Sequence, residues 1–222
     1  MKVSLIIFAL NEIDGMRVIM PRIKREWYDE LIIVDGGSTD GTIEYAKENN
    51  YPIFVQKQKG AGAAFREAME KVGGDIVVVF SPDGNSVPEK IPELVAKAEQ
   101  SDYDIVIASR YLDGAKSYDD DIVTAFGNWF FTHLMNLMFG SKLTDVFVMF
   151  RAYKRESINK LDVDIDSCVW GSLLLIRAIK SKLKITEIPA DEPSRIGGKR
   201  KMSPLKNGYY ELIAFFKEFF RE

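Results

Sequence analysis

Apolar runs alternate with polar, periodic stretches along the first half of the chain. Continuous apolar runs are typical of strands buried on both faces of a parallel sheet. The stretches between them have helical spacing, and Pro88 suits a first helical turn. We expect strands at residues 2–9, 31–34, 52–55, 75–80 and 104–108, and helices at residues 12–25, 41–49 (capped by Thr39 or Asp40), 61–72 and 88–99.

This alternation predicts an α/β fold with a Rossmann-like, mostly parallel central sheet flanked by helices and joined by right-handed crossovers. In such sheets ligands bind beyond the carboxyl ends of the strands. The rule selects residues 9–12, 35–39, 81–85 and 109–111 as one cleft.

Two later segments are apolar and long enough to form helices. Residues 122–139 would be apolar nearly all round as a helix, which indicates buried core or membrane contact. We expect His133 on this helix to be packed or hydrogen-bonded and not a ligand. Residues 205–220 carry a helical apolar stripe with Lys206, Lys217 and Arg221 interspersed or adjacent, as in an interfacial helix. Packing against the sheet or a homodimer partner is the alternative for both.

Composition narrows the class of protein. The 222 residues are 46% hydrophobic and 28% charged with a net charge of −3, which is typical of a globular protein and offers no basic field for nucleic acid. A single Cys (Cys168) and a single His (His133) exclude a disulfide scaffold and a His-rich metal site. Residues 3–10 are expected to form a strand and not a signal peptide, and no apolar stretch reaches the roughly 18 to 20 residues of a membrane span. We therefore expect a cytoplasmic protein, with peripheral contact to the cytoplasmic membrane face left open.

Two of the expected strand ends carry candidate chemistry. After the second strand, Asp35 is followed by glycines that allow close backbone approach, and its carboxylate can accept hydrogen bonds from a base or ribose. After the fourth, Asp83 and the amide of Asn85 can bind a hard cation that bridges a diphosphate. Each segment can equally be a plain turn, since Asp, Gly, Ser and Thr are the usual turn residues.

Taken together, the motifs resemble the family 2 inverting glycosyltransferases of the GT-A fold, particularly the polyprenyl-phosphate (dolichol-phosphate) sugar synthases. The resemblance covers roughly 190 residues and lies in the order of the segments rather than in any one of them. The matching segments are ALNE at 9–12, VDGGSTDGT at 34–42, KGAGAAFR at 59–66, ASRY at 108–111, DVFVMFR at 145–151, EIP at 187–189 and RIGGK at 195–199.

The resemblance implies one GT-A domain over residues 1–222, with a nucleotide-sugar-binding half (1–112) and an acceptor-side half (113–222) that ends in an amphipathic helix. It implies a UDP- or GDP-sugar donor, and a polyprenyl phosphate or glycan hydroxyl as acceptor. The residues implied to bind the donor nucleotide are Ala9, Leu10, Asn11, Glu12, Asp35, Gly37, Ser38, Gly62, Ser81 and Asp83.

It also implies chemical roles. Asp83, aided by Asn85, would hold Mg²⁺ or Mn²⁺ on the donor diphosphate, where the ion offsets charge on the leaving group. Arg110, Arg195 and Lys199 would pair with phosphate oxygens, although Lys199 begins a charge run that can simply be solvated. Asp145 would be the general base toward a hydroxyl acceptor, and its alternative is a structural cap.

Departures from the family pattern touch both halves. The family commonly has two carboxylates as D-x-D, whereas this chain has Asp83 and Asn85, and its VDDGS becomes VDGGS with Gly36. Fewer carboxylates weaken a metal site. On the acceptor side Val148 and Met149 replace Ser-Gly, and the run at 119–121 is expected to be a solvated turn. A non-catalytic nucleotide-sugar-binding scaffold and, less favoured, a sugar nucleotidyltransferase remain as alternatives; the latter should have a glycine-rich basic loop after the first strand.

Overall fold

The computed structural model describes residues 1–100, 103–161, 168–198 and 203–221. Its central sheet has seven strands in the order β3-β2-β1-β4-β6-β5-β7. All neighbouring pairs are parallel except those of β6, which runs antiparallel to both β4 and β5. The mostly parallel sheet is therefore confirmed. The strands are β1 (Val3–Ala9), β2 (Glu30–Asp35), β3 (Ile53–Val55), β4 (Ile76–Phe80), β5 (Ile105–Ser109), β6 (Arg151–Lys154) and β7 (Ile185–Pro189).

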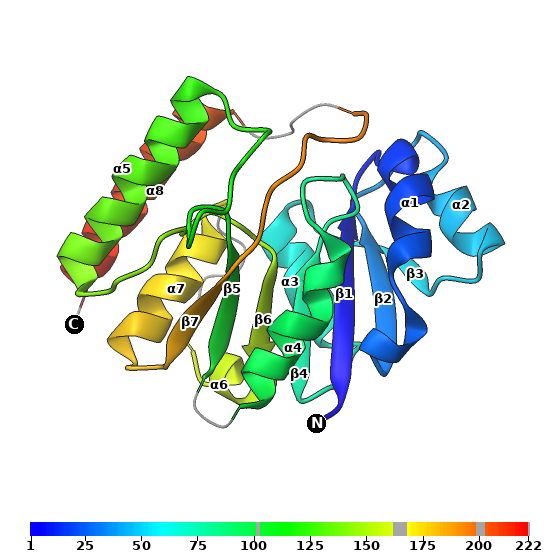
Figure 1. The fold of residues 1–222 in the computed structure, drawn as a ribbon, viewed down its shortest axis with the longest axis horizontal. Coiled ribbons are helices and arrows are strands. Elements are labelled where there is room, and N and C mark those ends of the chain that lie inside the picture. Colours follow the sequence, from blue (N-terminus) through cyan, green and yellow to red (C-terminus); the bar gives the residue numbers. More distant parts are fainter. Residues whose placement is uncertain (101–102, 162–167, 199–202, 222) are drawn as a thin grey trace.

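The helices cover the sheet and then extend beyond it (Figure 1). Two of them, α5 and α8, lie side by side at the edge of the molecule farthest from α1 and α2. The helices are α1 (Ile13–Ile19), α2 (Thr42–Glu48), α3 (Ala61–Met69), α4 (Ile91–Glu99), α5 (Ile122–Phe139), α6 (Arg155–Asn159), α7 (Trp170–Lys180) and α8 (Pro204–Phe219), with 3₁₀ turns η1 (Met20–Arg22), η2 (Arg25–Trp27) and η3 (Pro88–Lys90).

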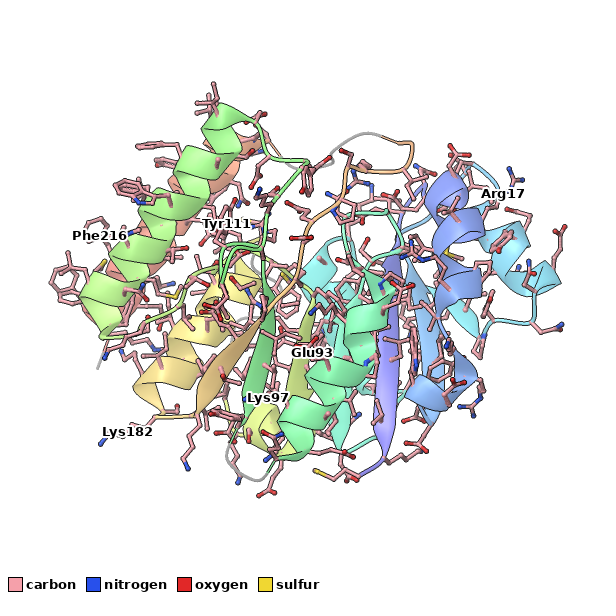
Figure 2. The ribbon with its side chains drawn as sticks, in the orientation of Figure 1. Arg17, Glu93, Lys97, Tyr111, Lys182 and Phe216 are labelled. Atoms are coloured by element: carbon pink, nitrogen blue, oxygen red, sulfur yellow. The ribbon has the colours of Figure 1, made fainter. Side chains whose placement is uncertain are left out.

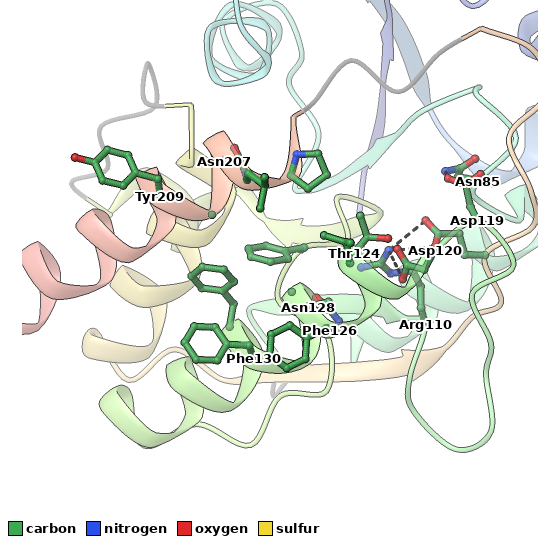
Figure 3. A pocket seen from close by; sticks show the side chains of 18 of the residues that line it. Asn85, Arg110, Asp119, Asp120, Thr124, Phe126, Asn128, Phe130, Asn207 and Tyr209 are labelled. Atoms are coloured by element: carbon green, nitrogen blue, oxygen red, sulfur yellow. Dashed lines mark hydrogen bonds and ion pairs between the residues drawn. The ribbon is translucent and has the colours of Figure 1, made fainter.

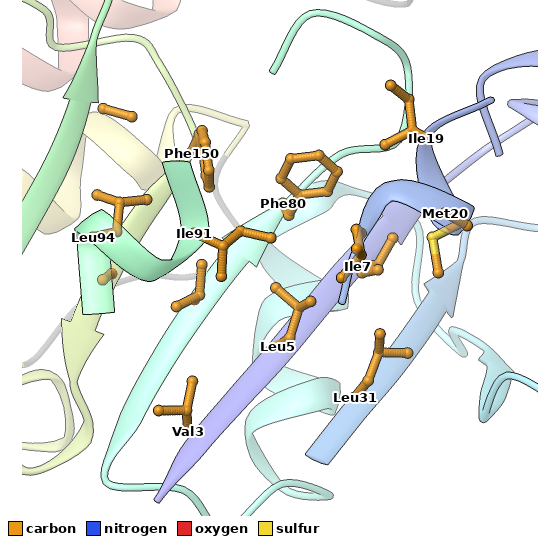
Figure 4. Close-up of a cluster of buried hydrophobic side chains, with 14 of the residues drawn as sticks. Val3, Leu5, Ile7, Ile19, Met20, Leu31, Phe80, Ile91, Leu94 and Phe150 are labelled. Atoms are coloured by element: carbon orange, nitrogen blue, oxygen red, sulfur yellow. The ribbon is translucent and has the colours of Figure 1, made fainter. Parts of the chain in front are cut away.

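Alternate side chains of the central strands enter two cores, because successive strand residues point to opposite faces. Leu5 and Ile7 of β1 join Phe80, Ile91 and the other residues of the core beneath α1 and α4 (Figure 4). Ile6 of β1 lies in the core on the opposite face, with residues of α3. The sheet is thus buried on both faces, which explains why its strands read as continuous apolar runs.

Several expected helices are too long. The helix predicted at 12–25 ends at Ile19, because Pro21 has no N–H to donate and the chain continues as 3₁₀ turns. The helix predicted at 88–99 starts as the 3₁₀ turn η3 and becomes α-helical at Ile91, and the one predicted at 61–72 ends at Met69. The helix predicted at 41–49 begins at Thr42, whose N–H donates to Asp40 Oδ1. These corrections leave the order of elements unchanged.

The direction of the antiparallel strand β6 determines which acceptor-side residues lie at the cleft. Because it runs opposite to β4 and β5, its first residue lies at the edge where those strands end. The segment before it, which begins at Asp145, therefore meets the segments that follow β4 and β5. Within the described residues, no helix is long and apolar enough to cross a membrane.

Candidate active site

The segments that follow β1 and β2 are tied together by side-chain to backbone hydrogen bonds. Asn11 N donates to Ser38 Oγ at 2.8 Å, and Thr39 N donates to Asn11 Oδ1 at 2.8 Å. Asn11 adopts a left-handed backbone conformation (φ 53°), which asparagine tolerates better than most residues. The backbone N–H of Glu12 donates to Thr42 Oγ1 at 3.0 Å. Two segments predicted to share the cleft are therefore neighbours.

Asp35 builds the loop that follows β2. Its Oδ1 accepts from the N–H groups of Gly37 and Ser38 at 2.8 and 2.6 Å, and its Oδ2 accepts from Ser38 Oγ at 2.6 Å. The side chain is fully buried. Both carboxylate oxygens are thus engaged within the chain, and a donor contact through Asp35 remains a prediction. Among the other predicted donor contacts, Gly62 is buried in the first turn of α3, and Ser81 is partly exposed directly after β4.

Asp83 is joined to the first loop by an arginine from far along the chain. Arg195 Nη1 donates to Glu12 Oε1 at 2.9 Å, and Arg195 Nη2 donates to Asp83 Oδ2 at 2.8 Å. The other oxygen of Asp83, Oδ1, accepts from Asn85 N at 3.0 Å. Predicted donor-side and phosphate-binding residues therefore meet in one cluster. Lys199, the third predicted phosphate ligand, lies outside the described residues.

The cluster has some features of a cation site and lacks others. Asn85 Oδ1 is buried and has no hydrogen-bond partner among the described residues, and Asn85 Nδ2 donates to Asp119 Oδ2 at 2.9 Å. An unsatisfied buried oxygen beside a carboxylate suits a hard cation. In the described part of the chain, however, no group of three or more His, Cys, Asp or Glu side chains is placed to hold a metal. The donor set that fits is one carboxylate and one amide oxygen.

Arg110, after β5, is surrounded by carboxylates. Its Nε donates to Asp145 Oδ2 at 2.6 Å, and its Nη1 lies 3.1 Å from Glu192 Oε2 and 3.7 Å from Asp120 Oδ2. Burial disfavours the charged guanidinium, but the attraction of Asp145 and Glu192 outweighs burial and raises the pKa of Arg110. This arginine is therefore held rigidly at the strand edge.

Asp145 is fully buried beneath that arginine. Its Oδ1 also accepts from the N–H groups of Phe147 and Val148 at 3.1 and 3.2 Å. Burial acts to raise the pKa of the carboxyl, but the Arg110 guanidinium and these hydrogen bonds outweigh it, so the pKa lies below its ordinary value. Its position matches the capping alternative better than the general-base role, which remains a prediction.

A groove of about 660 Å³ runs from this charged cluster along α5 and α8. Figure 3 shows Asn85, Arg110, Asp119 and Asp120 at one end, and Phe126, Phe130 and Tyr209 at the other. Polar groups thus stand at the sheet edge, and apolar walls lie between the helices. The apolar lining consists of Val123, Phe126, Phe130, Phe131, Phe147, Leu205 and Leu212.

Three acidic residues of this site were missed or misread from the sequence. Asp119 and Asp120 were expected in a solvated turn, but Asp119 accepts from Asn85, and Asp120 lies beside Arg110 and accepts from Tyr111 Oη. No sequence motif marks Glu192, yet both of its oxygens accept from Arg110. Burial raises the pKa of Glu192, and Arg110 offsets part of that rise. Glu192 is 82 residues from Arg110, so no local pattern could have linked them.

Comparison with known proteins now places the chain. Residues 4–162 match the family model described as glycosyl transferase family 2. The chain belongs to that family. The protein is therefore a glycosyltransferase, which favours the enzyme over the scaffold and nucleotidyltransferase alternatives.

This family 2 glycosyltransferase is 28% identical to an undecaprenyl-phosphate mannosyltransferase of Micrococcus luteus over 91% of its own length and 88% of that protein. It is 36% identical to a dolichol-phosphate mannosyltransferase of Pyrococcus furiosus over 52% of its own length and 35% of that protein. The resemblance to polyprenyl-phosphate sugar synthases inferred from the motifs is confirmed.

The fold is similar to that of a solved structure. A glucosyl-3-phosphoglycerate synthase from Mycobacterium tuberculosis, crystallised with Mn²⁺, UDP and phosphoglyceric acid, superimposes with a TM-score of 0.78. The two are 19% identical, and the match covers 100% of this chain and 79% of that one. The predicted GT-A fold is confirmed, and divalent metal occurs in structures of that fold.

Proposed function

We propose that this glycosyltransferase moves a hexose or N-acetylhexosamine, with inversion, from a UDP- or GDP-sugar to the head group of a lipid that lies in the groove. The observation that supports this proposal is the continuity of the groove. It begins at the carboxyl ends of β4 and β5, where a donor is expected, and continues between two apolar helices. A lipid acceptor matches a site that is charged at one end and apolar along its length.

On the donor side, Asp83 and the Asn85 amide would hold Mg²⁺ or Mn²⁺. That ion would act as a Lewis acid toward the departing nucleoside diphosphate. Arg195 contacts Asp83 and would pair with diphosphate oxygens through its planar fork. The loops at residues 9–12 and 35–38 would line the nucleotide pocket.

On the acceptor side, Arg110 would face the head group. If that group is a phosphate, it is already ionised and needs only the arginine as its partner. If it is a hydroxyl, a proton acceptor is required. Asp120 and Glu192 both line the groove, whereas Asp145 is fully buried. The base toward a hydroxyl would then be one of these two groove-lining carboxylates.

The outer face of α5 and α8 would rest on the membrane surface. The most exposed large apolar side chains include Ile122, Leu137 and Phe220, at 87%, 83% and 78% exposure. Figure 2 shows Phe216 of α8 pointing away from the sheet. Many large exposed apolar side chains on one helix pair are typical of an interaction surface.

The charges on α8 favour a bilayer as the partner of this surface. Lys206 and Lys217 are exposed, as is Arg221 just beyond the helix. Both acids of the helix, Glu211 and Glu218, are buried against α7. Every exposed charge on this helix is therefore positive, as anionic lipid requires.

A transfer assay tests this proposal. The protein is incubated with UDP- or GDP-hexoses, Mn²⁺ and vesicles containing either a polyprenyl phosphate or the matching polyprenol. We expect a glycosylated lipid from one of the two, and the productive arm identifies the head group. Transfer only to a water-soluble acceptor, with vesicles present, contradicts a lipid acceptor. A dimer in solution that fails to bind vesicles contradicts the membrane surface.

A further inference from the structure

Arg195 lies on a segment, residues 190–198, that we call the strap and that contacts the loops after β1 and β4. Its guanidinium joins two acids, Glu12 and Asp83, that are themselves buried. These acids come from the segments after β1 and β4, which are neighbours in the sheet. One side-chain cation therefore occupies the space between the acidic groups of the donor cleft.

The strap is fixed to the same loop through its backbone. Ile196 N donates to Asp83 O at 2.8 Å, and Arg195 N donates to Asp119 Oδ1 at 3.2 Å. Gly84 (φ 93°) allows this approach, because a Cβ there would lie 2.6 Å from Ile196 Cγ1. On the other side of the strap, a Cβ at Gly197 would lie 2.7 Å from Asp14 Oδ2. The close packing of this segment thus holds Arg195 next to Asp83.

A divalent cation at Asp83 would share the carboxylate with Arg195, or displace the arginine from it. Asp83 Oδ1 is engaged by Asn85 N, and Oδ2 by Arg195 Nη2. Placing an ion with two positive charges beside a guanidinium also costs electrostatic energy in a partly buried site. We infer that Arg195 is a tethered counter-ion, which holds the place of the divalent cation in the metal-free enzyme and competes with it for Asp83. This inference rests on the proposed metal role of Asp83 and Asn85.

The competition gives the arginine two successive positions. Without metal it pairs with both Glu12 and Asp83 and lowers the repulsion between these two buried acids. With the ion and the donor diphosphate bound, Asp83 and Asn85 would hold the ion, and the guanidinium would pair with phosphate oxygens instead of Asp83. Asn85 Oδ1, which has no partner within the described structure, would supply the amide oxygen. Metal without a diphosphate would bind weakly, because Arg195 would have no new partner.

Mn²⁺ titration followed by electron paramagnetic resonance, without donor or acceptor, tests the competition. Arg195→Ala should bind Mn²⁺ about tenfold or more tightly than the wild type, since a charged hydrogen bond no longer has to be displaced. Arg195→Lys keeps the charge without the fork and should lie between the two. Arg22→Ala is the matched control, because Arg22 pairs with Glu89 on an exposed surface. Asp83→Asn should abolish binding in both backgrounds.

Affinity for Mn²⁺ that is unchanged or weaker in Arg195→Ala overturns the inference, as does the absence of Mn²⁺ binding in every variant. Native-state hydrogen exchange of the wild type gives a test without substitution. The Ile196 amide should exchange faster with Mn²⁺ than without it, because the strap loosens from Asp83. An unchanged rate contradicts the displacement. Neither measurement requires turnover. A failed transfer assay would therefore contradict the proposed function without deciding whether Arg195 and the metal compete for Asp83.

Discussion

The strand-end cleft buries charged side chains, whereas the α5–α8 pair exposes apolar ones. In the cleft, the carboxylates of Asp83 and Asp145 are buried, and each pairs with an arginine, Asp83 with Arg195 and Asp145 with Arg110. On the helix pair, large apolar side chains such as Trp129 and Phe126 are exposed and stack on each other. A buried charge is tolerated only when it is paired, and exposed apolar surface persists where a partner covers it. The first region thus fits binding of a charged ligand, and the second fits contact with an apolar phase.

The largest expected effect tests whether the cleft is a donor site. Asp83→Ala should lower sugar transfer by at least about a hundredfold and remove metal-dependent donor binding, because it deletes the only carboxylate of the fitted cation site. Isothermal titration with UDP or GDP and Mn²⁺ measures this directly. Glu93→Ala, on the exposed face of α4, is the control and should behave as wild type. Normal transfer by the Asp83 variant would refute the assignment of the donor site.

The next effect concerns the charges that hold the cleft together. Arg110→Ala leaves Asp145 buried without its counter-ion and should cost about 3–5 kcal/mol of unfolding free energy. Urea denaturation measures the loss. Lys160→Ala, which removes an exposed pair with Glu156, should cost far less, because solvent screens that pair. Equal losses in the two variants would show that the buried pair contributes no more than a surface one.

Beneath the helix pair, one buried acid makes stability depend on pH. Burial raises the pKa of Glu211 from its ordinary value of 4.5 to about 8, although a hydrogen bond from Ser172 offsets part of the rise. The folded state holds this proton more tightly than the unfolded state. Stability from this group is therefore complete below pH 4.5 and is lost as pH rises through about 8.

Glu211→Gln should remove that dependence. Its melting temperature at pH 8.5 should exceed that of the wild type by several degrees, and the two should converge near pH 5. Thermal unfolding across the pH range measures the difference. Glu156→Gln, on an exposed helix, is the control. If the melting temperatures of the wild type and of Glu211→Gln fell equally with rising pH, another titrating group would cause the pH dependence.

The smallest expected effect concerns vesicle binding by the exposed apolar side chains of α5. Replacing Phe126 and Trp129 by Ser should weaken binding to anionic vesicles about tenfold while changing the unfolding free energy little, because both side chains are already exposed. Vesicle co-sedimentation measures the change. Val18→Ser removes an exposed apolar side chain from α1, on the opposite side of the molecule. If the Val18 variant lost as much binding, the helix pair would not be the docking face.

The sequence predicted the sheet half well because its signals are local. The five strands expected in the first half all occur, and the helix expected at 122–139 has those bounds in the structure. Its ends are set by neighbouring residues, with a capping box at Asp121 and a left-handed Gly140 after the last turn. The overlong helix at 12–25 shows the limit, since Pro21 stops the α-helix within an otherwise periodic stretch.

Tertiary structure alone decided the partners of the charged side chains. The four-residue strand β6 is too short to give a periodic signal, yet its antiparallel insertion brings Asp145 to Arg110. Arg195 is 112 residues from Asp83, and no spacing rule connects them. The sequence by itself determined the first five strands and the motifs at their ends, because backbone preference and hydrophobic period act over a few residues. Which carboxylate each arginine neutralises depends on how the chain returns to the sheet edge, and that is fixed only when the cores on both faces are packed.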